Sequence, residues 1–70
     1  MGLSIPQQSL VSIKVINLLG QTVTWVQEPE IKPAGTENYF IEAADFKARG
    51  VYYVQISIDD TRHIKRLVVY

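Results

Sequence analysis

Apolar and polar residues alternate with a period of two through most of this chain. In residues 10–17 the apolar positions Val11, Ile13 and Val15 are every second residue, and residues 51–58 show the same pattern. This is the period of a β-strand with one buried face, and no segment shows a 3.6-residue apolar period at useful length. The sequence therefore predicts an all-β fold in which no helix exceeds about two turns.

Turn residues divide the alternating segments. Asn17 and Gly20 tolerate positive φ, so residues 11–16 and 22–27 are predicted to pair as a hairpin, with Val23 and Trp25 on one face of the second strand. Residues 28–35 contain Pro29 and cannot form a central strand, so they are interpreted as a surface connection.

The second half continues the pattern. Tyr39, Ile41 and Ala43 are expected on one strand face, with Phe46 as an apolar plug beneath the short link over residues 44–50. Residues 51–58 and 63–70 are the last two strands, joined by a turn at residues 59–62, and Leu3 to Pro6 is a candidate edge strand. We therefore predict a small immunoglobulin-like antiparallel β-sandwich of about six to seven short strands. Tyr52, Val54, Ile56 and Ile58 are expected to share its core face, with Val51, Tyr53, Gln55 and Ser57 on the other.

The absence of cysteine limits how such a fold can be stabilised. Seventy residues form one small domain, and without cysteines neither disulfides nor thiolate metal sites are available. The lone His63 cannot build a metal site by itself. We expect no cofactor and a core made entirely by apolar packing, for which the 47% hydrophobic content is sufficient.

Charge is balanced overall but uneven along the chain. Seven basic and seven acidic residues give a net charge of zero, which argues against a nucleic-acid partner. Arg62, Lys65 and Arg66 lie in the last nine residues with no acid among them. These charges either keep a terminal edge strand soluble or form a signal that a partner reads.

No targeting or membrane segment is evident. The longest uncharged run, residues 17–27, is too polar to cross a bilayer. The first ten residues lack the basic and apolar regions of a secretory signal, and Pro6 stands where myristoylation needs Ser or Thr. Met1 and Gly2 are interpreted as an added start.

Catalytic motifs are equally scarce. The pairs Glu28/Glu30 and Asp59/Asp60 both fall in polar turns, whereas a two-carboxylate site needs one acid in an apolar pocket. Asp59 and Asp60 are better explained as turn residues that bond nearby backbone N–H groups. No serine lies in a nucleophile elbow. We expect no enzyme activity.

Four aromatic residues could instead form a sugar-binding platform: Trp25, Tyr39, Tyr52 and Tyr53. Large rings on alternating strands usually fill the core, so Trp25 and Tyr52 are predicted to be buried. Tyr53 is predicted to face away from the core, as the exposed aromatic residue of the group.

The order of several motifs is more specific than any one of them. Asn17-Leu18-Leu19-Gly20 follows a hydrophobic strand, Pro33, Gly35 and Thr36 come next, then Gly50-Val51-Tyr52, and Lys65 lies in the last strand. In this order, over residues 3–70, the sequence resembles the type A C-terminal sorting domains of proteins exported by the type IX secretion system of Bacteroidetes. Asn17 stands where that family usually has Asp, and Glu37-Asn38 lengthens the segment after Gly35.

The resemblance implies a secretion signal. Such a domain would lie at the C-terminal end of an N-terminal cargo protein, direct it from the periplasm across the outer membrane, and be removed by a sortase-like protease at the cell surface. The partners implied are the cargo, the secretion machinery and that protease, and the location is the cell surface or the medium. The alternatives are an adhesive or carbohydrate-binding module of a secreted protein and a structural spacer domain, which would be followed by another folded domain.

We expect the recognised surface to include the motif residues and the basic terminal strand, and self-association through exposed strand edges is a further expectation. Gly50 is expected to let the chain enter a buried strand without a Cβ clash. The candidate recognition residues are Gly35, Gly50, Val51, Tyr52, Tyr53, Lys65 and Arg66.

Overall fold

A computed structural model describes residues 2–42, 46 and 48–70 of the chain. The secondary structure of this described part consists of six β-strands. No helix occurs in that part. In chain order the strands are β1 (Gly2–Ile5), β2 (Ser9–Ile16), β3 (Thr22–Lys32), β4 (Gly35–Asn38), β5 (Gly50–Ile58) and β6 (Thr61–Val69).

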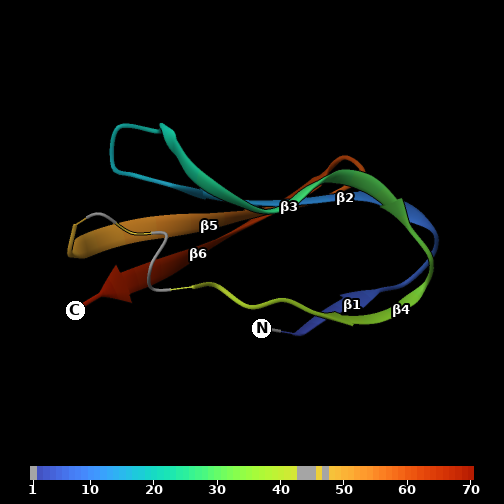
Figure 1. Ribbon diagram of the computed structural model, residues 1–70. Coiled ribbons are helices and arrows are strands. Elements are labelled where there is room, and N and C mark those ends of the chain that lie inside the picture. The colour runs from blue at the N-terminus through green and yellow to red at the C-terminus, as the bar shows by residue number, and fades with distance from the viewer. Residues whose placement is uncertain (1, 43–45, 47) are drawn as a thin grey trace.

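The strands form two antiparallel sheets stacked as layers (Figure 1). The larger sheet has the order β3-β2-β5-β6, and the smaller one pairs β1 with β4. Figure 1 shows the small sheet beneath one half of the large sheet, while the chain that follows β4 runs back beneath the other half. The predicted all-β sandwich is therefore confirmed.

The core lies between the layers and is built mainly by β2 and β5. The buried side chains share the face of these strands that is turned toward the second layer, and the most completely buried of them come from β2. The sequence alternation predicted this face correctly on both strands, with Ile58 partly buried at the end of β5. The buried apolar residues of the described chain are Ile5, Val11, Ile13, Val15, Tyr39, Tyr52, Val54 and Ile56.

The β2–β3 hairpin is held by the side chain of Asn17. Its Oδ1 accepts hydrogen bonds from the backbone N–H groups of Leu19 and Gln21, each 2.9 Å long, and its Nδ2 donates to Gln21 Oε1. Two backbone bonds, from Asn17 N–H to the Gln21 carbonyl and from Gly20 N–H to the Asn17 carbonyl, close the same turn. Gly20 adopts a φ of 81°, as a residue without Cβ does readily. The predicted hairpin is confirmed.

The prediction that Trp25 is buried is wrong. Eleven residues of β3 pair with eight of β2, and register shifts accommodate the excess at three places along β2. Each bulge changes which side of the sheet the next residue faces. Val23 and Val26 pack against the core, whereas Trp25 pairs with Lys14 on the opposite face and is 42% exposed.

The boundaries of two further elements differ from the sequence prediction. Residues 28–32, expected as a surface connection, continue β3, which is an edge strand and therefore tolerates the missing N–H of Pro29. β4 ends at Asn38, so Tyr39 and Ile41 contact the core from outside a strand. Ala43, also placed on that face, lies outside the described residues. Phe46 packs against the core as expected.

Candidate recognition surface

Six of the seven candidate recognition residues come together on β5 and β6. The register of this pair is regular over nine residue pairs and places Gly50 opposite Val69, Val51 opposite Val68, Tyr52 opposite Leu67, Tyr53 opposite Arg66 and Val54 opposite Lys65. The Gly-Val-Tyr motif therefore lies beside the apolar end of β6, and the basic residues follow directly. Motifs that are separate in the sequence lie side by side because the two strands make a hairpin.

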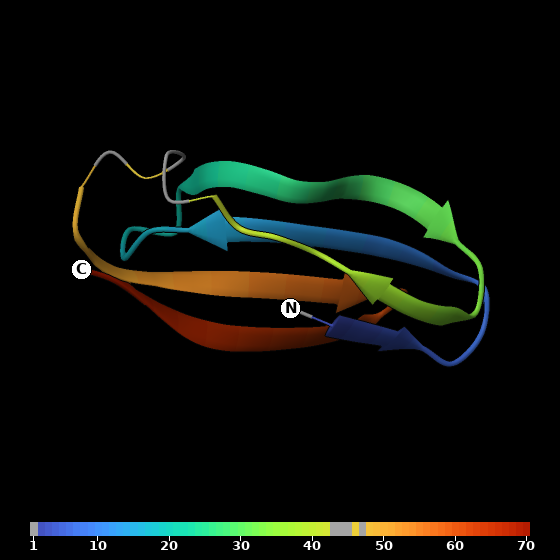
Figure 2. The ribbon, with the colours of Figure 1, turned by 60° about the horizontal axis from the view of Figure 1, so that its bottom comes forward.

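Gly35 is not part of this surface. It begins β4 and pairs with Ile5 of β1, in the second layer. Figure 2 shows that β4 begins at the end of the molecule where β5 ends, so Gly35 and Gly50 lie at opposite ends. The sequence order of the two glycines gave no indication of this separation.

Gly50 is required for its backbone conformation rather than for space. Its φ is 144°, a value that side-chain-bearing residues rarely adopt, and a Cβ built there would have no atom within 4 Å. The expected Cβ clash is therefore absent, which corrects the sequence interpretation. Gly35 shows the same combination, with a φ of 140° and open space around it.

Tyr52 and Tyr53, adjacent in sequence, have different roles. Tyr52 is 9% exposed; its ring lies 4.8 Å from that of Phe46, and its hydroxyl donates a 2.7 Å hydrogen bond to the Ala48 carbonyl. Tyr53 is half-buried on the outer face, opposite Arg66. Tyr52 thus stabilises the link before β5, and Tyr53 is the one that a partner can reach.

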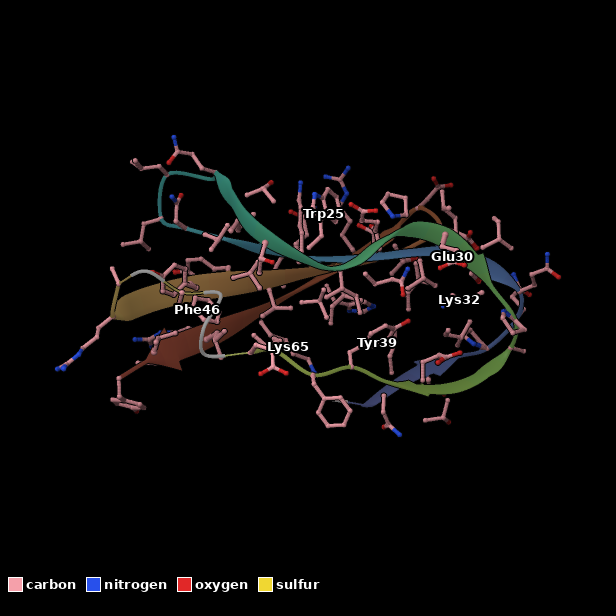
Figure 3. All side chains as sticks on the ribbon, in the orientation of Figure 1. Trp25, Glu30, Lys32, Tyr39, Phe46 and Lys65 are labelled. Carbon is pink, nitrogen blue, oxygen red and sulfur yellow. The ribbon has the colours of Figure 1, made fainter. Side chains whose placement is uncertain are left out.

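Lys65 and Arg66 point to opposite faces of the large sheet. Lys65 pairs with the buried Val54 and Arg66 with Tyr53, so the two cations flank the strand instead of forming one patch. In Figure 3, Lys65 lies on the side that carries the second layer, whereas Trp25 lies on the outer side. Both basic side chains are exposed. Within the described chain neither has an ion-pair partner.

Two of the four carboxylates considered for catalysis, Glu30 and Asp59, are engaged in structural contacts. Glu30 Oε2 lies 3.4 Å from Lys32 Nζ and accepts a hydrogen bond from Gln27 Nε2. Asp59 bonds the backbone of Leu10 rather than that of its own turn. Among the described residues, no group of three or more His, Asp or Glu side chains is arranged to hold a metal ion. No helix long and apolar enough to span a membrane occurs in the same residues.

The charged surroundings of Tyr39 escaped the sequence interpretation. Tyr39 is 8% exposed, and Figure 3 shows it on the same side of the large sheet as Glu30 and Lys32. Burial raises the pKa of Tyr39; Lys32 opposes this shift, and the charges of Glu37 and Glu30 add to it. Polar residues at the end of β3 gave no signal, since that segment was expected to be a loop.

Two exposed apolar features were also missed. Leu18 and Leu19, at the tip of the β2–β3 hairpin, are 70% and 83% exposed. On the outer face, the ammonium group of Lys14 lies 5.5 Å from the ring centroid of Trp25, within the range of a cation–π contact. The outer-face residue was missed because the sequence does not reveal the bulges in β3.

Comparison with known proteins adds one finding. A family model described as "Secretion system C-terminal sorting domain" matches residues 2–70. Neither the curated proteins nor the solved structures yielded a match to the chain.

Proposed function

The chain belongs to the family of secretion system C-terminal sorting domains, and from this membership we propose that the type IX secretion machinery reads the β5–β6 surface of the folded domain. Domains of this family are sorting signals for type IX secretion, which exports a cargo across the outer membrane to the cell surface or the medium. The match over residues 2–70 is the observation that carries the function. A signal of this class is not an enzyme.

The recognised surface is proposed from the hairpin geometry. Val51, Tyr53, Lys65 and Arg66 present a half-buried or exposed side chain on two adjacent strands. Gly50 and Tyr52 support this surface from within, through backbone conformation and core packing respectively. Gly35 is proposed to act on the second layer only. Regular pairing makes the surface rigid, which lowers the entropic cost of binding.

The remaining steps follow from the proposed signal. Residues 1–70 would form a single sorting domain, and the cargo would precede it in the chain. A sortase-like protease at the cell surface would remove the domain after export. The adhesive alternative gains no support from the aromatic residues. Tyr39 and Tyr52 are buried, and Trp25 and Tyr53 lie on the outer face, so the four rings do not form a platform.

The test is export of a fusion protein. Residues 1–70 joined to the C-terminus of a fluorescent protein with a periplasmic signal should carry it across the outer membrane of a host that has the type IX apparatus. Immunodetection in medium, surface and periplasm measures the exported fraction. Retention of the wild-type fusion in the periplasm would contradict the sorting function.

Two variants separate folding from recognition. Deleting residues 62–70 removes Leu67 and Val69, which pack against the core, at a cost of roughly 1.5 to 3 kcal/mol for each large aliphatic side chain if fully buried. We expect this domain to unfold and its cargo to remain in the periplasm. Lys65→Gln combined with Arg66→Gln keeps the apolar residues, and because both cations are exposed it should change stability by less than about 1 kcal/mol.

Loss of export by the folded double variant would support recognition of β6. Arg49→Gln, which removes an exposed cation outside the strands, is the matched control and should export normally. Normal export of the double variant would move recognition to another surface.

A further inference from the structure

The large sheet has two open edges, which differ in how well they can pair with a further strand. β3 forms one edge; it is bulged against β2 and contains Pro29, which lacks an N–H group. Bulges, proline and short pairing are the devices by which proteins prevent further strands from adding to an edge. β3 is therefore a poor template for another strand.

β6 is the opposite case. Its nine residues pair with β5 without a register shift, and it contains no proline or glycine. Figure 2 shows β6 along one whole border of the large sheet. A regular edge strand of this length presents a row of backbone donors and acceptors to which an extended segment can add.

The charges of β6 define the chemistry of such a segment. Arg62, Lys65 and Arg66 are exposed, and within the described part of the chain none of them has an ion-pair partner. β6 and its neighbour β5 contain no acidic residue. Because an added strand places its side chains beside those of the edge strand, acidic residues on that strand would meet unneutralised cations.

The order of basic and apolar residues along β6 determines in which direction an acidic segment would fit. The basic residues occupy positions 62–66, whereas Leu67, Val68 and Val69 form an apolar end. An antiparallel partner strand would begin beside the apolar end and continue beside the cations. The fitting sequence therefore starts with β-branched apolar residues and ends with acidic ones.

A second copy of this chain fits the edge less well. Antiparallel pairing of two β6 strands about a twofold axis brings cations of both copies together, and like charges on neighbouring strands are destabilising. The acidic residues Glu28 and Glu30 of a second copy lie on the bulged edge next to Pro29. Both pairings conflict with the features that the two edges show.

We propose that β6 is a strand-addition site for an extended acidic segment of a partner protein, which adds antiparallel to β6 and places its carboxylates beside Arg62, Lys65 and Arg66. This inference rests on the proposed function, because the partner is the component that reads the sorting signal. It specifies the mode of recognition and the chemistry of that component.

The test uses a defined probe and does not depend on export. The probe is a labelled nine-residue peptide, the length of β6, made of Val and Thr with Glu at positions 4, 5 and 8, which full antiparallel pairing places opposite Arg66, Lys65 and Arg62. Titration into isotope-labelled domain should shift and protect backbone amides of β6, with little change in β3. Replacing the glutamates by glutamine should weaken binding about tenfold, because several exposed charge pairs are lost.

Variants of the domain provide matched controls. Arg66→Gln should weaken binding, and Arg49→Gln, a change of equal charge outside β6, should not. Raising the salt concentration should weaken binding of the glutamate peptide but not binding of the glutamine peptide. A proline in the centre of the peptide should abolish binding, since it removes a ladder N–H group. Thermal melting checks that each variant is folded.

The contrary outcomes are equally defined. Equal binding of the two peptides, amide changes on β3, or no binding at millimolar peptide would overturn the inference. So would a concentration-dependent dimer that involves β6, since the occupant would then be a second copy. If the fusion is exported but the peptide does not bind, strand addition is wrong and the sorting function stands. If the peptide binds and the fusion is not exported, the sorting function fails alone.

Discussion

Asp59 and Leu10 are joined by two hydrogen bonds across 49 residues of sequence. The Leu10 N–H group donates to Asp59 Oδ1 at 2.9 Å, and the Asp59 N–H group donates to the Leu10 carbonyl at 2.8 Å. The β5–β6 turn is thereby attached to β2, the strand that supplies the most completely buried core residues. Asp59 has a φ of 52°, a left-handed conformation that Asp tolerates better than most residues.

Replacing Asp59 tests this attachment. Asp59→Ala removes the acceptor of the Leu10 N–H group and keeps the left-handed backbone, so we expect a loss of about 1 to 2 kcal/mol in the free energy of unfolding. Asp59→Asn retains an acceptor oxygen and should lose less. Chemical denaturation measures both, and Asp60→Ala is the neighbouring control. An Asp59→Ala domain as stable as the wild type would show that the bond from the Leu10 N–H group to the Asp59 side chain contributes nothing.

The position of Trp25 leads to a second prediction. Trp25→Thr should lower the free energy of unfolding by less than about 1 kcal/mol, because the ring is exposed and its cation–π contact with Lys14 is a surface contact. Tyr52→Ala should cost about 3 kcal/mol or more, because it removes a buried ring and a hydrogen bond. Denaturation curves compare the two, and acrylamide should readily quench the fluorescence of Trp25. The reverse order of stabilities would place Trp25 in the core.

At the tip of the β2–β3 hairpin, Asn17 should contribute to stability, whereas Leu18 and Leu19 should not. Asn17→Ala removes three side-chain hydrogen bonds from the β2–β3 turn and should lower the free energy of unfolding by about 1 kcal/mol. Leu18→Ser combined with Leu19→Ser should keep the free energy of unfolding within about 0.5 kcal/mol of the wild-type value, since both leucines are exposed. Thermal and chemical unfolding measure these changes. A large destabilisation by the serine variant would mean that the leucines are packed.

Tyr39 should make stability depend on alkaline pH. Burial raises its folded-state pKa above the ordinary value of 10.0, so folding favours the neutral hydroxyl. The stabilisation is fully present below pH 10 and is lost as the pH rises through the folded-state pKa. Above pH 10 the wild type should therefore lose stability more steeply than Tyr39→Phe. Denaturation at several pH values tests this, with Tyr70→Phe at an exposed position as the control. Parallel pH profiles of the wild type and Tyr39→Phe would contradict the prediction.

Much of the fold could be predicted from the sequence alone. Alternation identified the core face of β2 and β5, because strict period two places every second residue on one side of a regularly paired strand. Asn17 and Gly20 located the hairpin, because its tight turn depends on side-chain acceptors and positive φ. The order of the motifs indicated the family, which the match over residues 2–70 confirmed.

Only the tertiary structure decided the positions of Trp25 and the two cations of β6. The outer-face position of Trp25 depends on bulges in β3, which arise from pairing eleven residues with eight and leave no periodic trace in the sequence. That Lys65 flanks the core side and Arg66 the outer side depends on the register with β5. Local sequence identified β2, β5 and the β2–β3 turn, but not the extension of β3 to Lys32 or the end of β4 at Asn38. The face and neighbours of each side chain follow from pairing between distant segments, which short-range patterns do not encode.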